Sequence, residues 1–294
     1  MRIIRFISNT GTAQLAAVTN DAKIFLLPFR NFLELLQKSE DDGKSCLAIV
    51  NEAIEGTSPL DQSLEELSLQ LPVNAYEVWA SGVTYLKSKK ARNYESQGSE
   101  DAESYYDKVY EAERPEIFLK STDRRTIGPN DPLFLRSDSN WQIPEPELGL
   151  VIDKQGKIVG YTIGNDMSSR DIEGENPLYL PQAKIWKHSC SIGPAILLAE
   201  TVEDPYNFEI ICRIFRGEKK VFEESANTSQ LKRKYEELVD FLIRDNEVFP
   251  GTILLTGTCI VPPNDFTLNE GDLVEIEIPG IGLLSNPIKN QAAV

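Results

Sequence analysis

Histidine and paired cysteines are scarce in this chain of 294 residues. The single histidine is His188, and a lone histidine is more often a packing or surface residue than a catalyst. The four cysteines stand apart without C-x-x-C spacing, which predicts reduced, packed thiols. Zinc centres and disulfide frameworks are therefore not expected.

Long apolar runs and positive charge are also lacking. No apolar segment is long enough to span a bilayer, and the first residues lack the apolar core and cleavage site of a signal peptide. We therefore expect a cytoplasmic protein. The 30 Lys and Arg against 46 Asp and Glu give a formal charge of −16, which argues against nucleic-acid partners and anionic membranes. An anionic substrate would need a local positive centre.

The apolar pattern predicts an α+β protein that is mainly β, with a small N-terminal α/β domain at residues 1–72 and a larger domain at residues 73–294. The hydrophobic fraction of 41% is ordinary for a globular protein. In the first domain the expected strands are residues 1–8, 12–19 and 22–27, and the expected helices are residues 31–39 and 46–54.

The larger domain alternates apolar and polar residues in several segments. Residues 208–215 and 272–280 have apolar side chains at every second position, the period of a half-buried strand. One amphipathic helix is expected at residues 228–246, capped by Thr228 or Ser229. The charged segment 86–114 is expected to be helical, either as a lid over a site or as a solvated surface helix.

Three carboxylates are predicted to meet at one end of a β-hairpin. The run VIDKQGKIV is typical of a hairpin, and if Asp153 faces Ile158, paired residue numbers add up to 311. That register places Glu145 opposite Asp166. Glu145 and Glu147 are two residues apart, so on an extended strand they leave the same face.

Three oxygen ligands without nearby histidine or cysteine favour a hard divalent cation: Mg²⁺, or alternatively Mn²⁺ or Ca²⁺. The alternative is an acidic hairpin end neutralised by Arg170 or a lysine. Downstream, Gln182 and Lys184 share a face if that piece is extended. A lysine beside a dication has a depressed pKa and exchanges protons near neutrality, unless it is only a counter-ion to the acids.

The stretches PEPELGLVI, GYTIGNDMSSRD, NPLYLPQAK and LLTGTCIVPP together resemble the fumarylacetoacetate hydrolase family, from about Pro72 to the C-terminus. The resemblance implies a mixed β-sandwich roll with a smaller N-terminal domain, assembled as a homodimer or homotetramer. It also implies Mg²⁺ or Mn²⁺ bound by Glu145, Glu147 and Asp166, with a 2-oxo acid substrate that chelates the metal.

One departure from the family narrows the chemistry. Hydrolytic members carry an N-Y-x-x-H-x-x-E motif whose histidine and glutamate activate water. The matching stretch here, GVTYLKSKKA, keeps Tyr85 but has Ser88 at the histidine position and Ala91 at the glutamate position. Neither side chain is a general base at neutral pH, so hydrolytic cleavage of a C–C bond lacks its expected catalyst.

A dehydratase subgroup of the family fits better, on stretches such as VYEAERPEIFLKST and ENPLYLPQAKI. Its members convert 2-keto-3-deoxy-D-arabinonate to 2-oxoglutarate semialdehyde. The resemblance implies that Glu116 is a catalytic carboxylate and Lys184 a catalytic lysine, a base or, less favoured, a Schiff-base former. The alternatives are a diketo-acid hydrolase, a 2-oxo acid isomerase or decarboxylase of the family, and a non-catalytic sugar-acid binder.

Further side chains near these motifs are candidates for binding the substrate: Ser81, Gly82, Thr84, Tyr85, Lys120, Arg170, Gln182, Thr256 and Thr258. For Lys120 and the two later threonines, an ordinary structural role fits the sequence equally well. Arg170 and Asp171 are expected to brace the site, with Arg170 as partner to a carboxylate. The sequence leaves open the exact substrate and its stereochemistry, the native metal and the oligomer size.

Overall fold

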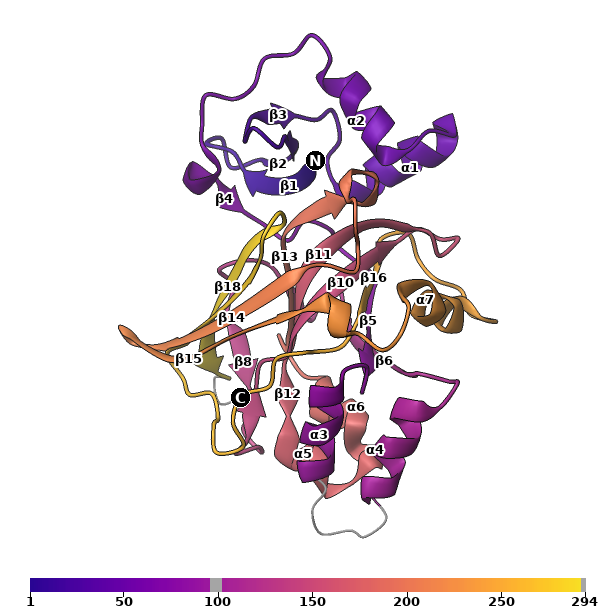
Figure 1. Cartoon of the computed structure of the whole chain (residues 1–294). Coiled ribbons are helices and arrows are strands. Elements are labelled where there is room, and N and C mark those ends of the chain that lie inside the picture. Colours follow the sequence, from indigo (N-terminus) through magenta and orange to yellow (C-terminus); the bar gives the residue numbers. More distant parts are fainter. Residues whose placement is uncertain (96–101, 292–294) are drawn as a thin grey trace.

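The computed structural model describes residues 1–95 and 102–291, and it is mainly β, as predicted (Figure 1). Within these residues one large mixed sheet faces a smaller second sheet. In spatial order the large sheet contains β3 (Ile24–Leu26), β2 (Ala13–Val18), β1 (Arg2–Ile7), β13 (Cys190–Leu198), β11 (Ile158–Asp166), β10 (Pro146–Ile152), β16 (Thr252–Leu255), β5 (Glu77–Gly82) and β6 (Glu116–Thr122), with β4 (Ser68–Leu69) beside β1 and β7 (Thr126–Ile127) beside β13.

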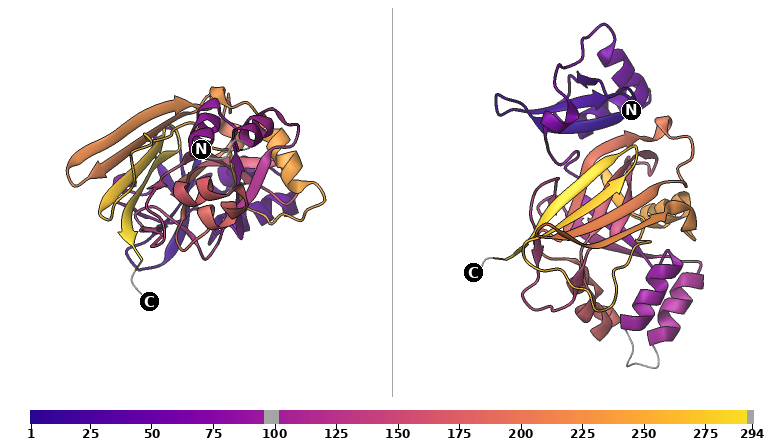
Figure 2. Two further views of the ribbon diagram at one scale, coloured as in Figure 1. Left: turned by 90° about the horizontal axis from the view of Figure 1, so that it is seen from below. Right: turned by 60° about the vertical axis from the view of Figure 1, so that its left-hand side comes forward.

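The second sheet contains β15 (Lys219–Asn227), β14 (Glu209–Arg216), β17 (Asp272–Ile278), β18 (Gly282–Asn290) and β8 (Leu133–Leu135), while β9 (Gln142–Ile143) pairs with β12 (Ser168–Ser169). The helices are α1 (Phe32–Asp42), α2 (Cys46–Ile54), α3 (Leu86–Glu95), α4 (Ala102–Glu111), α5 (Arg170–Glu175), α6 (Leu180–Lys184) and α7 (Tyr235–Ile243). Helices α3 to α6 lie at the opposite end of the molecule from α1 and α2 (Figures 1 and 2). No helix among the described residues is long and apolar enough to cross a membrane.

Strand β10 lies at the centre of the sandwich and is buried along its whole length. Its residues Leu148, Leu150 and Ile152 belong to the core shared with the second sheet and α7. Val151 points the other way, into the core that contains α1 and α2. A strand covered on both faces reads as a continuous apolar run, which explains the sequence of this segment and confirms the sandwich.

The N-terminal segment has the predicted order of three strands and two helices. Strand β1 pairs with β13, for example Arg2 with Leu197, so the large sheet continues from this segment into the rest of the chain. Phe32 of α1 packs in one core with Val78 and Ile253 of the large sheet. The two parts thus share a sheet and a core. The division into domains 1–72 and 73–294 stays a prediction.

The β10–β11 hairpin has the predicted register along most of its length. The pairs Pro146–Asn165 and Val151–Gly160 both add up to 311. At the turn the prediction is wrong by one residue, because Asp153 N donates to the backbone oxygen of Lys157 at 3.0 Å, and a bulge at Val151/Ile152 restores the register. The Asp153 carboxylate accepts two backbone N–H bonds inside the turn, which closes the loop one residue early.

The helix predicted at residues 228–246 starts later than expected. Residues 228–230 form a short 3₁₀ turn capped by Asn227, and α7 begins only at Tyr235. Between them, Lys232 N donates to the backbone oxygen of Thr84 at 3.0 Å. Arg233 donates to the backbone oxygen of Ala112 at 2.6 Å, just after α4. These bonds to distant segments keep residues 231–234 out of the helix, which the local apolar period does not reveal.

Candidate active site

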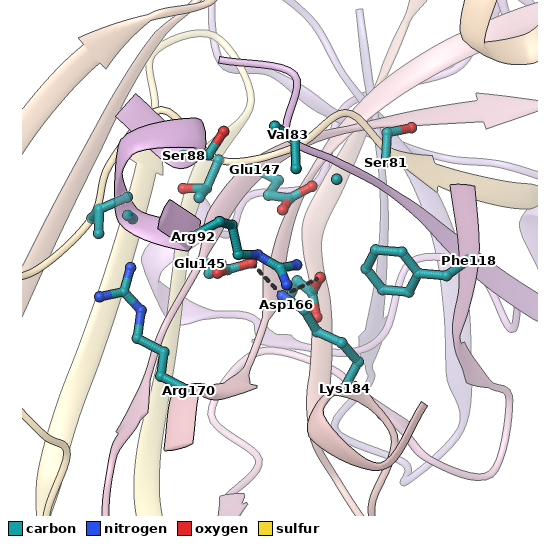
Figure 3. Close-up of a pocket in the computed structure, with 14 residues that line it drawn as sticks. Ser81, Val83, Ser88, Arg92, Phe118, Glu145, Glu147, Asp166, Arg170 and Lys184 are labelled. Carbon is teal, nitrogen blue, oxygen red and sulfur yellow. Dashed lines mark hydrogen bonds and ion pairs between the residues drawn. The ribbon is translucent and has the colours of Figure 1, made fainter. Parts of the chain in front are cut away.

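The three predicted metal ligands lie together at one end of the β10–β11 hairpin. Asp166 ends β11, Glu147 lies on β10 and Glu145 precedes it, with Asp166 N donating to the Glu145 backbone oxygen at 3.0 Å. One carboxylate oxygen from each lies within 4.8 Å of the others, and all three side chains are buried. Figure 3 shows them turned towards one cavity, so the convergence predicted from the register is confirmed.

The electrostatics of the trio favour a bound cation. Burial raises the pKa of Glu147 well above its usual range, and the charges of Asp166 and Glu145 raise it further. Glu147 Oε2 accepts one backbone bond, from Gly257 N at 2.6 Å. Buried carboxylates that repel one another gain most from a shared dication, and a set of oxygen ligands suits Mg²⁺. The residues present therefore fit a hard divalent cation.

Two buried lysines reach the same carboxylates. Lys184 Nζ lies 2.6 Å from Glu145 Oε2 and 3.4 Å from Asp166 Oδ2. Lys120 Nζ lies 2.6 Å from Asp166 Oδ1 and donates to the backbone oxygens of Met167 and Lys184. The ion pair and the two backbone hydrogen bonds direct the Lys120 ammonium group away from the cavity, which Lys120 does not line. It holds Asp166 in place, whereas Lys184 borders the cavity.

The protonation of Lys184 follows the charges around it. Burial acts to lower the pKa of Lys184, but Asp166, Glu145 and Glu173 outweigh burial and raise that pKa above its usual value. In return, burial acts to raise the pKa of Glu145, but the positive charge of Lys184 lowers it below its usual value. The depressed lysine pKa that the sequence predicts therefore requires a dication to take up the charge of the carboxylates.

Glu116, the other predicted catalytic residue, begins β6 and is not itself among the residues that line the cavity, but it lies against Gly82 of β5, which is one of them. Its carboxyl oxygen Oε2 is buried, and burial raises the pKa of Glu116, helped by Glu173 and Glu145 although Arg92 opposes them. A Cβ on Gly82 would lie 1.7 Å from Glu116 Oε2, so only glycine leaves room for this carboxyl group. A carboxyl group with a raised pKa can hold a proton for transfer.

Helix α3 forms one wall of the cavity, so part of the charged segment 86–114 faces the site. Ser88, Ala91 and Arg92 line the cavity from this helix (Figure 3). Arg92 Nη2 lies 2.7 Å from Glu173 Oε1 of α5, and both side chains are buried. Sequence reasoning missed this pair. Helical spacing could have indicated Arg92 alone, since Arg92 follows Ser88 by four residues and therefore shares its face of the helix.

The predicted substrate-binding residues fall into two groups. Those that line the cavity are Ser81, Gly82, Arg170 and Thr258. Those that do not line it are Thr84, Tyr85, Lys120, Gln182 and Thr256. The apolar lining residues Val83, Phe118 and Val261 were missed, because nothing in their local sequence distinguishes them from core residues.

The geometry predicted for Gln182 is wrong. Residues Leu180–Lys184 form the short helix α6 instead of an extended segment, so Gln182 and Lys184 do not share a face. Gln182 is exposed, and its backbone oxygen accepts from Arg136 Nη1 at 2.7 Å. Pro181 at the start of α6 has the fixed backbone angle that favours a first helical turn, which the extended reading overlooked.

Several other candidates hold the backbone around the cavity. Thr84 Oγ1 donates to the backbone oxygen of Thr256 at 2.7 Å, and Thr256 Oγ1 donates to that of Leu148 at 3.0 Å. Tyr85 packs in the core of the sandwich. The hydroxyl groups of Thr84 and Thr256 thus tie the segment after β5 to the end of β16 and to β10.

Arg170 and Asp171 brace the site at the start of α5. Arg170 is buried and lies over the Trp141 ring, with 5.3 Å from its guanidinium carbon to the ring centre. Asp171 accepts from Ser139 Oγ at 2.6 Å and from Asn140 N at 2.6 Å, and these bonds lower the pKa of Asp171 although burial acts to raise it. The pair joins α5 to the loop before β9.

The cysteines and the single histidine do not contribute to the cavity. The cysteines are buried and form no disulfide, as predicted, and none of them lines the cavity. His188 stacks on Phe134 with 4.9 Å between ring centres and is also absent from the cavity lining. The described site is therefore built from carboxylates, lysines, arginines and hydroxyl groups.

Known proteins are similar to this chain, both over the region that contains the site and over most of its length. A family model described as fumarylacetoacetate (FAA) hydrolase C-terminal matches residues 77–289. A probable 2-keto-3-deoxyxylonate dehydratase of Haloferax volcanii is 43% identical over 277 residues, covering 94% of each chain. A 2-dehydro-3-deoxy-D-arabinonate dehydratase of Saccharolobus solfataricus is 44% identical over 231 residues, covering 79% of this chain and 78% of the relative.

A solved structure agrees with these relatives. It is a 2-keto-3-deoxy-D-arabinonate dehydratase complexed with magnesium and 2,5-dioxopentanoate. It matches this chain with a TM-score of 0.85 and 35% identity, and the match covers 100% of both chains. The family model spans well over half of the sequence and includes every residue of the carboxylate trio. The chain therefore belongs to the fumarylacetoacetate hydrolase family.

Proposed function

We propose that this protein is a magnesium-dependent dehydratase that removes water from a 2-keto-3-deoxy sugar acid, such as 2-keto-3-deoxy-D-arabinonate, and gives 2-oxoglutarate semialdehyde. The proposal rests on the proximity of a candidate base, Lys184, and a candidate acid, Glu116, to the buried carboxylate trio. Lys184 contacts the trio, and Glu116 has a raised pKa within electrostatic reach of it. The dehydratase names of the two relatives support the proposal, and 2,5-dioxopentanoate in the related structure is the same compound as the semialdehyde.

The reaction needs a proton removed at C3 and a hydroxyl group lost at C4. Glu145, Glu147 and Asp166 would hold the Mg²⁺, which supplies Lewis-acid polarisation of the 2-oxo group and so acidifies the C3 protons. Lys184 takes one C3 proton, because its Nζ is the amine that borders the cavity at the trio. Glu116 gives its proton to the C4 hydroxyl as the C4–O bond breaks and water leaves. Proton shifts in the unsaturated product then turn its C5 hydroxyl into the aldehyde.

The substrate's polar groups are assigned to the side chains that line the cavity. Arg170 supplies positive charge, Ser81 and Thr258 supply hydroxyl groups, and Gly82 leaves space beside Glu116. For Thr84, Lys120 and Thr256 we propose no direct contact, because their side chains bond to the backbone. Tyr85 packs in the core and Gln182 is exposed, so neither is assigned a contact. Phe118 and Val261 exclude water from one side of the cavity, which strengthens the charge interactions within it.

A hydrolase is less compatible with the wall formed by α3. Ser88 Oγ donates to the Tyr85 backbone oxygen at 2.8 Å and accepts from Tyr85 N at 3.2 Å, so it caps the helix. Ala91 has no polar group. The helix that would present a water-activating histidine and glutamate to the cavity therefore presents neither.

An assay with a panel of 2-keto-3-deoxypentonates, in the presence of Mg²⁺ or Mn²⁺, tests the proposal. We expect metal-dependent release of the semialdehyde, detected by its aldehyde group and by NMR. Conversion of acylpyruvates into two acids, with no aldehyde from any sugar acid, would instead identify a hydrolase. Thermal stabilisation by the sugar acids without product would identify a binding protein.

We also propose that the chain acts in the cytoplasm as a homodimer or homotetramer, as the family resemblance implies. Light scattering coupled to gel filtration measures the mass of the assembly and so tests the proposed oligomeric state. A mass of one chain at micromolar concentration would contradict it.

A further inference from the structure

A buried ion pair in the cavity wall is not used by the reaction described above. Arg92 Nη2 of α3 and Glu173 Oε1 of α5 lie 2.7 Å apart, with side chains 7% and 1% exposed. Removing two charges from water is costly, so a buried ion pair adds little stability compared with apolar residues of similar size. Its position beside the catalytic lysine suggests a role in the site.

The pair extends to Lys184 through one oxygen atom. Glu173 Oε1, which contacts Arg92, also lies 3.4 Å from Lys184 Nζ. In the described part of the chain, the carboxylates within 4 Å of Lys184 Nζ belong to Glu145, Asp166 and Glu173. Of these three, Glu173 is the one outside the proposed metal ligands. Figure 3 shows the side chains of Arg92 and Lys184 entering the cavity from different directions, with their charged ends near Asp166.

A dication changes which of these contacts persist. A cation that shares the oxygens of Glu145 and Asp166 repels the ammonium group that now lies against them. Glu173 then remains as the carboxylate that holds Lys184 Nζ at the cavity. The guanidinium of Arg92 fixes the orientation of the Glu173 carboxylate. Residues that lie behind the side chains of a metal site commonly orient them in this way.

We propose that Arg92 and Glu173 are positioning residues for Lys184, which makes α3 part of the reaction. Helix α3 presents Ser88 and Ala91 where hydrolytic members carry their water-activating residues, and it contributes through Arg92 instead. The inference rests on the proposed function for the identity of the proton that Lys184 removes.

The test compares Arg92→Met, Glu173→Gln and the double variant. Lys89→Met is the matched control, because Lys89 lies on the same helix and pairs with Asp107 of α4 at 2.9 Å, away from the cavity. Three measurements are made. Steady-state kinetics give kcat and KM for 2-keto-3-deoxy-D-arabinonate, NMR gives the magnesium-dependent exchange of the C3 protons of pyruvate in D₂O, and calorimetry gives the Mg²⁺ affinity without substrate.

We expect Arg92→Met and Glu173→Gln each to lower kcat and C3 exchange by about 10–100-fold, with KM and Mg²⁺ affinity close to those of the wild type. The double variant should be no worse than Glu173→Gln, because both changes act through one oxygen. Arg92→Lys should recover part of the loss, since it keeps the charge without the planar fork. Lys89→Met should match the wild type in all three measurements.

Wild-type kcat in Arg92→Met or Glu173→Gln would overturn the inference. So would independent, multiplying losses in the double variant, or an equal loss in Lys89→Met, because both outcomes indicate that the pair only holds the helix in place. A parallel loss of Mg²⁺ affinity would assign the pair to the metal instead. If the wild type converts no sugar acid, the proposed function fails, while pyruvate exchange still reports whether Arg92 and Glu173 position Lys184.

Discussion

At the scale of single residues, the chemistry depends on charges placed where water is largely excluded. Burial and the neighbouring carboxylates raise the pKa of Glu147, whereas positive neighbours lower the pKa of Glu145 against the effect of burial, although the two are only two residues apart. Lys184 accounts for the difference, because it contacts Glu145. Lys184 thus favours the charged form of Glu145, a proposed metal ligand, and also borders the cavity in which a substrate would react.

Lys184→Ala should separate metal binding from turnover. The substitution removes the proposed base but none of the three carboxylates, so Mg²⁺ affinity should be retained or strengthened. Turnover should fall by about 10²–10⁴-fold, the usual contribution of one acid–base group. Calorimetry and a steady-state assay on the same preparation measure both. Surviving turnover would show that the lysine is only a counter-ion.

Glu116 should limit activity on the alkaline side. Because burial raises the pKa of Glu116, its proton persists to higher pH than that of an exposed glutamate. A reaction that needs this proton declines as the pH rises through the raised pKa, and it is unaffected by Glu116 at lower pH. Glu116→Gln should lower kcat by about 10²–10⁴-fold and abolish that alkaline decline. An unchanged pH profile in the variant would assign the acid to another group.

At the scale of elements, the trio depends on the end of the β10–β11 hairpin opposite its turn and on the segment that follows β16. Gly257 in that segment has φ +94° and donates its N–H to Glu147 Oε2. A Cβ there would lie 1.9 Å from Thr84 Oγ1 and 2.9 Å from the Ser81 backbone oxygen. Only glycine allows the backbone to approach the carboxylate so closely.

Gly257→Ala should therefore destabilise the fold by roughly 1–3 kcal/mol and weaken Mg²⁺ binding at the same time. Gly217→Ala is the control, because Gly217 has φ +61° in the turn between β14 and β15 with open space around it. It should cost less and leave Mg²⁺ affinity unchanged. Urea unfolding and calorimetry compare the two; equal Mg²⁺ affinities in both variants would contradict the role of Gly257.

The sequence predicts those parts of the site that depend on local periodicity. The period-two hairpin gave Glu145, Glu147 and Asp166, because strand register is a short-range property. Arg92 and Glu173 come from two helices that only the tertiary fold brings together, and no local pattern pairs them. The exposed position of Gln182 and the late start of α7 have similar causes, since a short helix and distant hydrogen bonds override the local pattern.

At the scale of the whole molecule, the N-terminal segment and the large sheet share one core. Phe32 of α1 is fully buried in that core with Val78 and Ile253. Because apolar contacts cross the proposed boundary near residue 72, we expect the two parts to unfold together. Helices α3, α5 and α6, which contribute residues to the cavity, lie at the opposite end of the molecule from α1 and α2 (Figures 1 and 2), so we expect the N-terminal segment to affect the site mainly through stability.

Phe32→Ala should lower the free energy of unfolding by about 3–5 kcal/mol in one cooperative transition, with KM unchanged. Leu178→Ala is the control, because Leu178 is 83% exposed and its loss should be nearly neutral. Urea denaturation followed by fluorescence and circular dichroism measures both. Two separate transitions would show instead that residues 1–72 fold as an independent domain.

Calorimetric titration of Mg²⁺ into the metal-free protein tests most directly whether Glu145, Glu147 and Asp166 hold one dication. We expect one site per chain in the wild type, and an affinity lower by at least about tenfold in Glu145→Gln, together with a parallel loss of activity. Absence of Mg²⁺ binding to the wild type, or equal affinity in Glu145→Gln, would contradict this expectation.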